Sequence, residues 1–502
     1  MQQKNDGSAK PGGGGTAWRA QTALASPPCS RYAEAMTRLR LHHPPAPTRR
    51  ETIAGLVAAI GLPATGRSQT PEPAARTLVA APLAAALKPA PARPTAIWAF
   101  DGSAAPPVLR IKRNETARIV LDNRTPAPLS LHWHGLRGQS GMDGVGGFSQ
   151  PPVAPGERFE YRLQPGDSGT VLIRPLLIGG SSEPAARGLA GMLIVEEDTP
   201  PSVDLDLPVL VSDWLLGEDE RLSPIETASQ AGAGAGRLGS WLTVNGGPPP
   251  QTIKVAPGSR VRLRLANACN ARIMRLRFDG ARATVIAVDG QPSETFEPVR
   301  AQLPFAPGTR YDLMVDMPAN AGASAAVTAL IGGGVPLVKL VTEGKPRIPH
   351  AEAPMLPPNP TLPPAVRLQD ARRAEFVVEG GAKLVEGKLV HDGLDLARPW
   401  RVNSGIGDPA KPLFSVKRGT PVVIALDNRT AFPQPLHLHG HCFRLLHPLD
   451  DGWEPYFLDT VLVPEGRRLH IAFIAENPGR WLVSSTVLDR YDLGLWSWFE
   501  VT

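Results

Sequence analysis

The most constraining feature of this sequence is an internal repeat. The string LDNRT occurs twice, at Leu121–Thr125 and at Leu426–Thr430, and each copy follows an alternating apolar run typical of a β-strand. Nine residues after the Asn of each copy stands a His-x-His-Gly motif, at 132–135 in the first copy and at 437–440 in the second. Self-similarity of this kind, with strand-like alternation around it, predicts copies of one β-domain.

A third, weaker copy lies between the other two. Arg260–Ala268 contains the same alternating run and includes Asn267, but Leu276 and Phe278 stand where the outer copies have histidines. The 50 glycines and 55 prolines make up about a fifth of the 502 residues, which is typical of many short strands joined by tight turns and not of a helical bundle. We therefore predict three tandem domains, at 95–200, 201–350 and 351–502.

The two His-x-His motifs have a direct chemical meaning. On a β-strand, residues i and i+2 point to the same face, so both imidazoles of a pair can converge on one point. Imidazole is a ligand suited to copper and zinc. Because two such pairs occur at the same offset in separate repeats, we expect the first and third domains to share a metal site. The residues expected at this site are His132, His134, His437 and His439.

Longer strings surround these motifs. The first unit contains LHWHGLRG and GMDGVGGFSQPPVAPGERFEYR, the second WLTVNG and VIAVDGQP, and the third PLHLHGHCFRLL, DGWEPYFLDTVLVPEG and a terminal WFEV. With these strings in this order, the chain from about Ile97 to Thr502 resembles the multicopper oxidase (laccase-like) family. The resemblance implies an all-β fold of three tandem cupredoxin-like (plastocyanin-like) Greek-key β-sandwich domains. It also implies a trinuclear copper cluster held between the first domain and the third.

The resemblance implies roles for five residues that this sequence keeps. His132 would bind the type 2 copper together with His437. His134 and His439 would each bind one of the two type 3 coppers. Asp143, in the string GMDG, matches an acidic residue that handles protons near the cluster.

The positions that the family uses for its other copper ligands carry different residues here. The type 3 positions hold Arg174, Leu176, Ser484 and Thr486, and the type 1 positions hold Gln434, Ser485 and Arg490. A blue copper centre needs a thiolate with two imidazoles, so we predict none. Cys442 does not replace the thiolate, because strand alternation puts it on the opposite face from His439.

The surviving histidines predict at most one metal ion, copper, in a relative of copper-dependent oxidoreductases without laccase-type turnover. The guanidinium charge of Arg174 would repel this ion unless Arg174 turns away towards an acid such as Asp143. The alternative is a non-catalytic periplasmic scaffold that binds a protein partner and keeps the fold without copper. The sequence names neither a substrate nor a partner.

Residues 1–66 read as a leader. The pair Arg49-Arg50 resembles a twin-arginine export signal, and it precedes a short apolar run, Ile53–Leu62. This run is too short to span a bilayer, so we predict a signal peptide for export to the periplasm and no membrane anchor. The Ala/Pro-rich stretch at 67–94 is predicted as a linker.

The charge of the chain is concentrated in this leader. The net charge is +6, and residues 1–66 hold eight Lys/Arg against three Asp/Glu. The remainder is nearly neutral and has no basic stripe, so nucleic acid is not an expected partner. Cys269 and Cys442 fall in separate predicted domains and make no disulfide framework. We expect a monomer.

Overall fold

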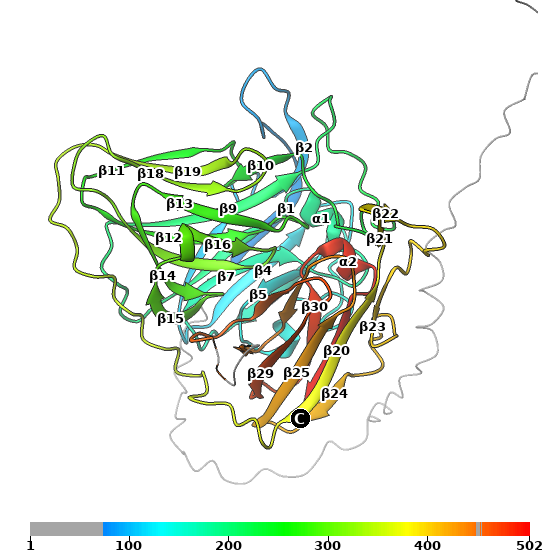
Figure 1. Cartoon of the computed structure of the whole chain (residues 1–502). Coiled ribbons are helices and arrows are strands. Elements are labelled where there is room, and N and C mark those ends of the chain that lie inside the picture. Colours follow the sequence, from blue (N-terminus) through cyan, green and yellow to red (C-terminus); the bar gives the residue numbers. More distant parts are fainter. Residues whose placement is uncertain (1–73, 448–451, 453) are drawn as a thin grey trace, which may run out of the picture. The chain divides into compact units, whose positions relative to one another are not determined.

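Short β-strands make up nearly all of the regular secondary structure in the described residues (Figure 1). The computed structural model describes residues 74–447, 452 and 454–502, so the predicted leader at 1–66 lies outside the described residues. The helices are one-turn elements, namely α1 (Ser182–Ala186), α2 (Leu488–Asp492) and the 3-10 turns η1 (Ser140–Met142) and η2 (Val299–Ala301). None of the helices in this part of the chain has the length and apolar character needed to cross a membrane. The predicted all-β class is confirmed.

The first domain is a sandwich of two four-stranded sheets. The strand order is β2-β1-β4-β6 in one sheet and β3-β8-β7-β5 in the other. The strands are β1 (Arg76–Ala85), β2 (Thr95–Phe100), β3 (Val108–Lys112), β4 (Ala117–Asn123), β5 (Leu131–His134), β6 (Arg158–Leu163), β7 (Gly169–Pro175) and β8 (Gly191–Glu196). Apolar side chains of both sheets, among them Leu121 and Ile173, form one core between them.

The second domain has a six-stranded and a five-stranded sheet. Their orders are β10-β9-β12-β17-β14-β15 and β11-β19-β18-β13-β16. The strands are β9 (Leu205–Trp214), β10 (Trp241–Val244), β11 (Gln251–Val255), β12 (Arg260–Asn267), β13 (Met274–Asp279), β14 (Arg282–Val288), β15 (Gln291–Phe296), β16 (Gln302–Phe305), β17 (Arg310–Asp316), β18 (Ser324–Ala329) and β19 (Val335–Thr342).

The third domain pairs two five-stranded sheets and adds a hairpin, β21-β22. The sheet orders are β23-β20-β25-β29-β27 and β24-β31-β30-β26-β28. The strands are β20 (Arg372–Gly380), β21 (Lys383–Val385), β22 (Lys388–Val390), β23 (Trp400–Val402), β24 (Phe414–Val416), β25 (Thr420–Asn428), β26 (Gln434–Leu438), β27 (Arg444–Leu446), β28 (Thr460–Val463), β29 (Arg468–Ala475), β30 (Gly479–Ser485) and β31 (Trp496–Val501).

The repeated Asn has the same structural task in all three domains. It ends β4, β12 and β25, and its side-chain amide donates at least two hydrogen bonds of 2.8–3.1 Å to backbone carbonyls beyond the strand. The acceptor pairs are Ala127 and Val153 for Asn123, Arg272 and Phe305 for Asn267, and Phe432 and Val463 for Asn428. These bonds fix the loop that leads to the next strand, which carries the histidines in the outer domains.

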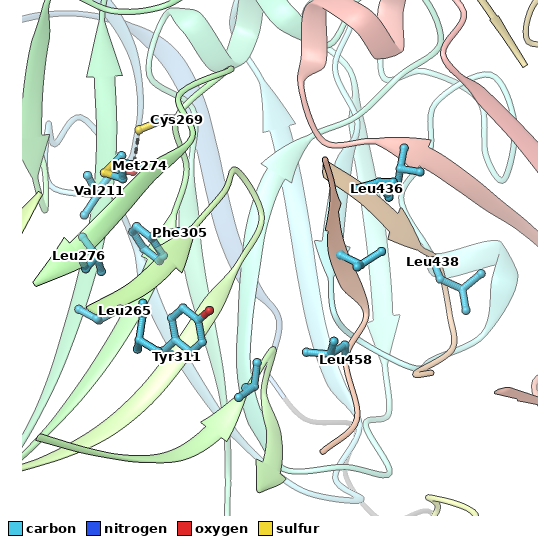
Figure 2. Close-up of a cluster of buried hydrophobic side chains, with 14 of the residues drawn as sticks. Val211, Leu265, Cys269, Met274, Leu276, Phe305, Tyr311, Leu436, Leu438 and Leu458 are labelled. Carbon is cyan, nitrogen blue, oxygen red and sulfur yellow. Dashed lines mark hydrogen bonds between the residues drawn. The ribbon is translucent and has the colours of Figure 1, made fainter. Parts of the chain in front are cut away.

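The middle domain uses the corresponding strand for packing. Leu276 and Phe278 on β13 are buried in an apolar cluster that continues into the third domain. Figure 2 shows Leu276 with Leu265 and Phe305 on one side of this cluster, and Leu436, which precedes His437 on β26, on the other. The middle copy of the repeat therefore contributes apolar packing where the outer copies contribute imidazoles.

The predicted linker at 67–94, of which 67–73 lie outside the described residues, is wrong where β1 forms. Residues 76–85 form β1, which pairs in parallel with β4 and antiparallel with β2. The second and third domains begin in the same way, since β9 runs parallel to β12 and β20 runs parallel to β25. The Ala/Pro-rich composition hid a strand that alternates buried and less buried residues, with Leu78 and Ala80 in the core.

The role of β1 can be tested by unfolding. We expect Leu78→Ala to lower the free energy of unfolding by about 2–5 kcal/mol, because it removes a fully buried side chain from the core of the first domain. Leu384→Ala, at an exposed position of the β21-β22 hairpin, should change it by less than about 0.5 kcal/mol. Urea denaturation measures both. Equal, small effects would show that 76–85 does not pack as a core strand.

Candidate metal centre

The two His-x-His motifs meet between the first and third domains. His132 and His134 lie on β5, His437 lies on β26, and His439 follows β26 directly; all four are buried. The rings stack in pairs across the domains. The ring centroids of His134 and His437 are 3.7 Å apart, and those of His132 and His439 are 4.3 Å apart. The alternation of side chains along a strand thus brings all four sequence-predicted histidines together.

His132 and His437 are oriented in the same way. The Nδ1 of His132 donates to the backbone carbonyl of Asp143 at 2.7 Å, and the Nδ1 of His437 donates to that of Asp459 at 2.9 Å. These bonds leave Nε2 of each ring as the unprotonated nitrogen. Among the described residues, neither Nε2 has a hydrogen-bond partner although both are buried. Two unpaired imidazole lone pairs inside a protein are the arrangement expected of metal ligands.

His439 is neutral and is held by Asp143. Its Nδ1 donates to Asp143 Oδ2 at 2.8 Å, and its Nε2 lies 3.1 Å from Ser484 Oγ. Burial lowers the pKa of His439 to about 3. Burial also opposes the charged form of Asp143, but the imidazoles of His439 and His132 outweigh it and lower the pKa of that carboxyl below its ordinary value. A metal needs the neutral form of imidazole, and His439 is already in it.

His134 is connected to Asp459 through a hydroxyl. Its Nε2 lies 2.8 Å from Thr460 Oγ1, and this hydroxyl donates to Asp459 Oδ1 at 2.8 Å. Since the hydroxyl proton is used in that bond, the Thr460 oxygen accepts from His134. Burial lowers the pKa of His134 and of His437, so both rings are neutral near pH 7.

The described residues offer two overlapping sets of metal-binding atoms. His132, His437 and His439 form one set, and His134, His437 and Asp459 form the other; within each set the ligand atoms lie within 4.8 Å of one another. Three imidazoles are suited to copper or zinc, and two imidazoles with a carboxylate are suited to a wider range of metals. Because His437 belongs to both sets and has one unprotonated nitrogen, that nitrogen can serve only one set at a time.

Arg174 does not turn to Asp143. It lies opposite His132 in the pairing of β5 with β7, and its buried Nη2 donates to the backbone carbonyl of Thr486 at 3.1 Å. Burial lowers the pKa of the Arg174 guanidinium to about 10. Within the described residues Arg174 forms no salt bridge, so a backbone carbonyl takes the place of the acid that the sequence suggested.

Two of the residues that the resemblance places at type 1 copper positions contact each other. Arg490 Nη1 donates to Gln434 Oε1 at 2.7 Å, and two backbone carbonyls accept from the same guanidinium. The rings of Trp400 and Phe432 lie 5.1 and 5.3 Å from its central carbon. Ser485 Oγ accepts from a backbone amide. Arg490 and Gln434 therefore form a packed hydrogen-bonded pair at these positions.

The remaining sulfur and imidazole groups nearby have other roles. Cys442 is a buried thiol whose pKa is raised by burial well above its ordinary value, so it offers no thiolate. His441 donates from Nδ1 to the carbonyl of His439 at 3.1 Å, and its Nε2 accepts from the amide of Asn477 at 3.3 Å. Both nitrogens of His441 are thus used in structural bonds.

Sequence reasoning missed Asp459 and Thr460. Both belong to the string DGWEPYFLDTVLVPEG, which supported the resemblance but received no role. It also missed Arg310 of the middle domain, which binds Asp459. Asp459 could have been found as an acidic residue within a string that resembles the family. Arg310 could not, because its partner lies in another domain and no motif surrounds it.

Comparison with known proteins identifies relatives over most of the chain. Family models described as multicopper oxidase match residues 84–200, 206–330 and 385–502. Multicopper oxidase MmcO of Mycobacterium tuberculosis is 28% identical over 476 residues, which cover 86% of this chain and 87% of that protein.

Solved structures agree with this result. A multicopper oxidase from Pseudomonas parafulva superposes with a TM-score of 0.73 at 30% identity, covering 85% of this chain and 100% of that one. A multicopper oxidase from Pseudomonas thermotolerans gives a TM-score of 0.74 at 29% identity, covering 86% of this chain and 99% of that one. The three predicted cupredoxin-like domains are thereby confirmed.

The contact between Asp143 and His439 predicts a difference between two substitutions. We expect Asp143→Ala to lower the free energy of unfolding of the metal-free protein by about 1–3 kcal/mol, because it leaves His439 Nδ1 buried without an acceptor. Asp143→Asn keeps an acceptor oxygen and should cost less. Urea denaturation at pH 7 compares the two, and equal losses would contradict the hydrogen-bonding role.

The pair formed by Gln434 and Arg490 predicts non-additive effects. We expect Gln434→Leu to lower the free energy of unfolding by about 1–3 kcal/mol, because the buried guanidinium loses an acceptor. The double variant Gln434→Leu/Arg490→Met should recover much of this loss, since an apolar pair of similar volume leaves no unpaired charge. A double-mutant cycle measured by urea unfolding checks this. Strictly additive losses would contradict the pairing.

Proposed function

The chain belongs to the multicopper oxidase family, and on this premise we propose that it binds a single copper ion through its two His-x-His motifs and has no blue copper centre. The ligands in this proposal are His132, His437 and His439. His134 lies beside them and completes the cluster of four rings. Laccase-type turnover is not expected of such a site.

One observation carries the proposal of a metal. The Nε2 atoms of His132 and His437 are buried, unprotonated and without a hydrogen-bond partner in the described part of the chain. An unpaired buried nitrogen costs free energy, on the order of 1–3 kcal/mol each, unless something binds it. A cation that accepts two imidazole lone pairs removes this cost. The donor set of three neutral imidazoles fits copper.

The other ligand positions of the family support one ion and not three. Arg174 brings a buried guanidinium into the sheet position opposite His132. Ser484 occupies another ligand position and bonds to His439 Nε2 through its hydroxyl. Arg490 and Gln434 are bound to each other, so neither offers a site for the copper through which electrons enter in the family.

The chemistry in this proposal is limited to one centre. A bound copper ion would supply one-electron exchange with a small oxidant or reductant. The protein would hold His132 and His437 in the required tautomer through the carbonyls of Asp143 and Asp459. The carboxylate of Asp143 would keep the proton of His439 on Nδ1, so that Nε2 faces the metal when the Ser484 hydroxyl turns aside.

We also propose that the protein is exported to the periplasm by a twin-arginine signal. The support is the pair Arg49-Arg50 followed by the apolar run Ile53–Leu62. Twin-arginine export carries folded proteins, so copper could be inserted before export. The protein would act there as a monomer, without a nucleic-acid partner.

The metal proposal predicts a defined loss. After copper loading and removal of free metal, the mature protein should contain about one copper per chain and show no intense blue absorption band. The double variant His132→Ala/His437→Ala should contain almost none, because both unpaired nitrogens are gone. His350→Ala is a suitable control, since His350 pairs with Asp204 outside the cluster. Mass spectrometry of the metal content, with a visible spectrum, measures these outcomes.

The outcomes separate the two functions that the sequence left open. Unchanged copper in the double variant would refute the proposed ligands, and an intense blue band would refute the absence of a type 1 centre. A wild-type protein without bound metal would favour the non-catalytic scaffold. In that case co-purification of a periplasmic protein partner becomes the relevant measurement.

A further inference from the structure

The middle domain carries no histidine of the cluster, yet it reaches the cluster through one side chain. Arg310, at the start of β17, is fully buried. Its Nη1 and Nη2 donate to the two carboxylate oxygens of Asp459 at 3.1 and 2.5 Å. Its remaining donors bind the backbone carbonyls of Thr170, Gly308 and Asp289. Every N–H group of this guanidinium therefore donates a hydrogen bond to a buried acceptor.

Asp459 stands between Arg310 and the histidines. Its Oδ1 lies 3.3 Å from His437 Nδ1 and 3.5 Å from His134 Nε2. Its backbone carbonyl accepts from His437 Nδ1 and sets the tautomer of that ring. The same carboxylate belongs to one of the two competing donor sets, with His134 and His437.

The contact with Arg310 makes the two sets of metal-binding atoms electrostatically different. A bidentate guanidinium engages both oxygens of a carboxylate, and a cation bound to Asp459 would lie next to the permanent charge of Arg310 in a buried site, where repulsion is weakly screened. Among the described residues no guanidinium bonds to His132, His437 or His439, and Arg174, which lies opposite His132, donates instead to the backbone carbonyl of Thr486. The electrostatics of the site therefore disfavour a metal at Asp459.

The backbone around the cluster is shaped to admit this contact. Gly135, which ends the first His-x-His-Gly motif, has φ +99° and lies against the guanidinium of Arg310 and the carboxylate of Asp459. A Cβ at Gly135 would collide with both groups. The glycine of the motif thus makes room for an arginine that comes from another domain.

We infer that Arg310 is a positioning residue that keeps Asp459 from binding the metal and thereby directs the ion to His132, His437 and His439. This inference rests on the proposed function, because it concerns the same copper ion. Through Arg310, the middle domain would help to determine which residues bind the ion. The freed carboxylate of an Arg310 variant should then enter the coordination.

The test compares copper-loaded variants of the mature protein. Arg310→Met removes the guanidinium, and Arg310→Lys keeps the charge without the bidentate geometry. Arg262→Met is the matched control: Arg262 is also buried and bonds two carboxylates, those of Asp312 and Glu197, at 2.6 Å each, and it contacts none of the four histidines. Electron paramagnetic resonance of bound Cu(II) counts the coordinated nitrogens, and competition with a chelator gives the affinity.

We expect the wild-type spectrum to show three nitrogen ligands. Arg310→Met should show two with a carboxylate oxygen and an affinity raised by about 10–100-fold, because the ion leaves the three imidazoles only for a set that binds it more tightly. Arg310→Lys should show a smaller change in the same direction. Arg262→Met should keep the wild-type spectrum. The double variant Arg310→Met/Asp459→Asn, which has no carboxylate to release, should return to three nitrogens.

Three results would overturn the inference. They are a wild-type spectrum and affinity in both Arg310 variants, the same shift in Arg262→Met, or a two-nitrogen spectrum that persists in the double variant. If Arg310→Met does not fold, the spectrum and the copper affinity of Arg310→Lys alone decide: wild-type values overturn the inference. Absence of copper from the wild-type protein refutes the proposed function itself and is distinct from these results.

Discussion

Burial of four imidazoles in one cluster is the constraint on which the rest of the site depends. Inside a protein each ring nitrogen must be hydrogen-bonded or bound to a metal, since an unpaired one carries a desolvation cost. The carbonyls of Asp143 and Asp459 satisfy one nitrogen of His132 and of His437, and this choice fixes which nitrogen is left. The loops that supply these carbonyls come from the first and third domains, so the metal-binding geometry is set by the backbone of both.

The three copies of the repeat show how one β-domain has been put to two uses. Each copy keeps a parallel pair of strands and an Asn that fixes the following loop. Beyond the Asn the outer copies direct imidazoles into the domain interface, whereas the middle copy places Leu276 in the core. The middle domain still affects the site, because Arg310 extends from its sheet to Asp459. If Arg310 directs the ion as we infer, a repeat without ligands also selects which ligands are used.

The sequence predicted the features that depend on local periodicity. Strand alternation and the shared offset from Asn123 and Asn428 were enough to bring the four histidines together. Contacts between domains could not be predicted in this way, because Arg310 and Asp459 are far apart in the chain and neither has a distinctive local pattern. β1 was missed for another reason: its small residues and the prolines around it resemble a linker, and only pairing with β4 reveals it as a strand. The orientation of the Arg174 side chain could not be predicted either, because its acceptor is the backbone carbonyl of Thr486, far away in the sequence.

The resemblance places two buried arginines at positions where the family has copper ligands, and their partners explain how they are tolerated. Arg490 is bound by Gln434 and by backbone carbonyls and lies against the rings of Trp400 and Phe432. These contacts replace the water that a guanidinium loses on burial. Arg174 has the Thr486 carbonyl and no salt bridge within the described residues, so its burial is less well compensated. The region of Arg490 and Gln434 is therefore packed as a stable part of the fold, whereas the histidine cluster keeps two buried nitrogens without a hydrogen-bond partner among the described residues.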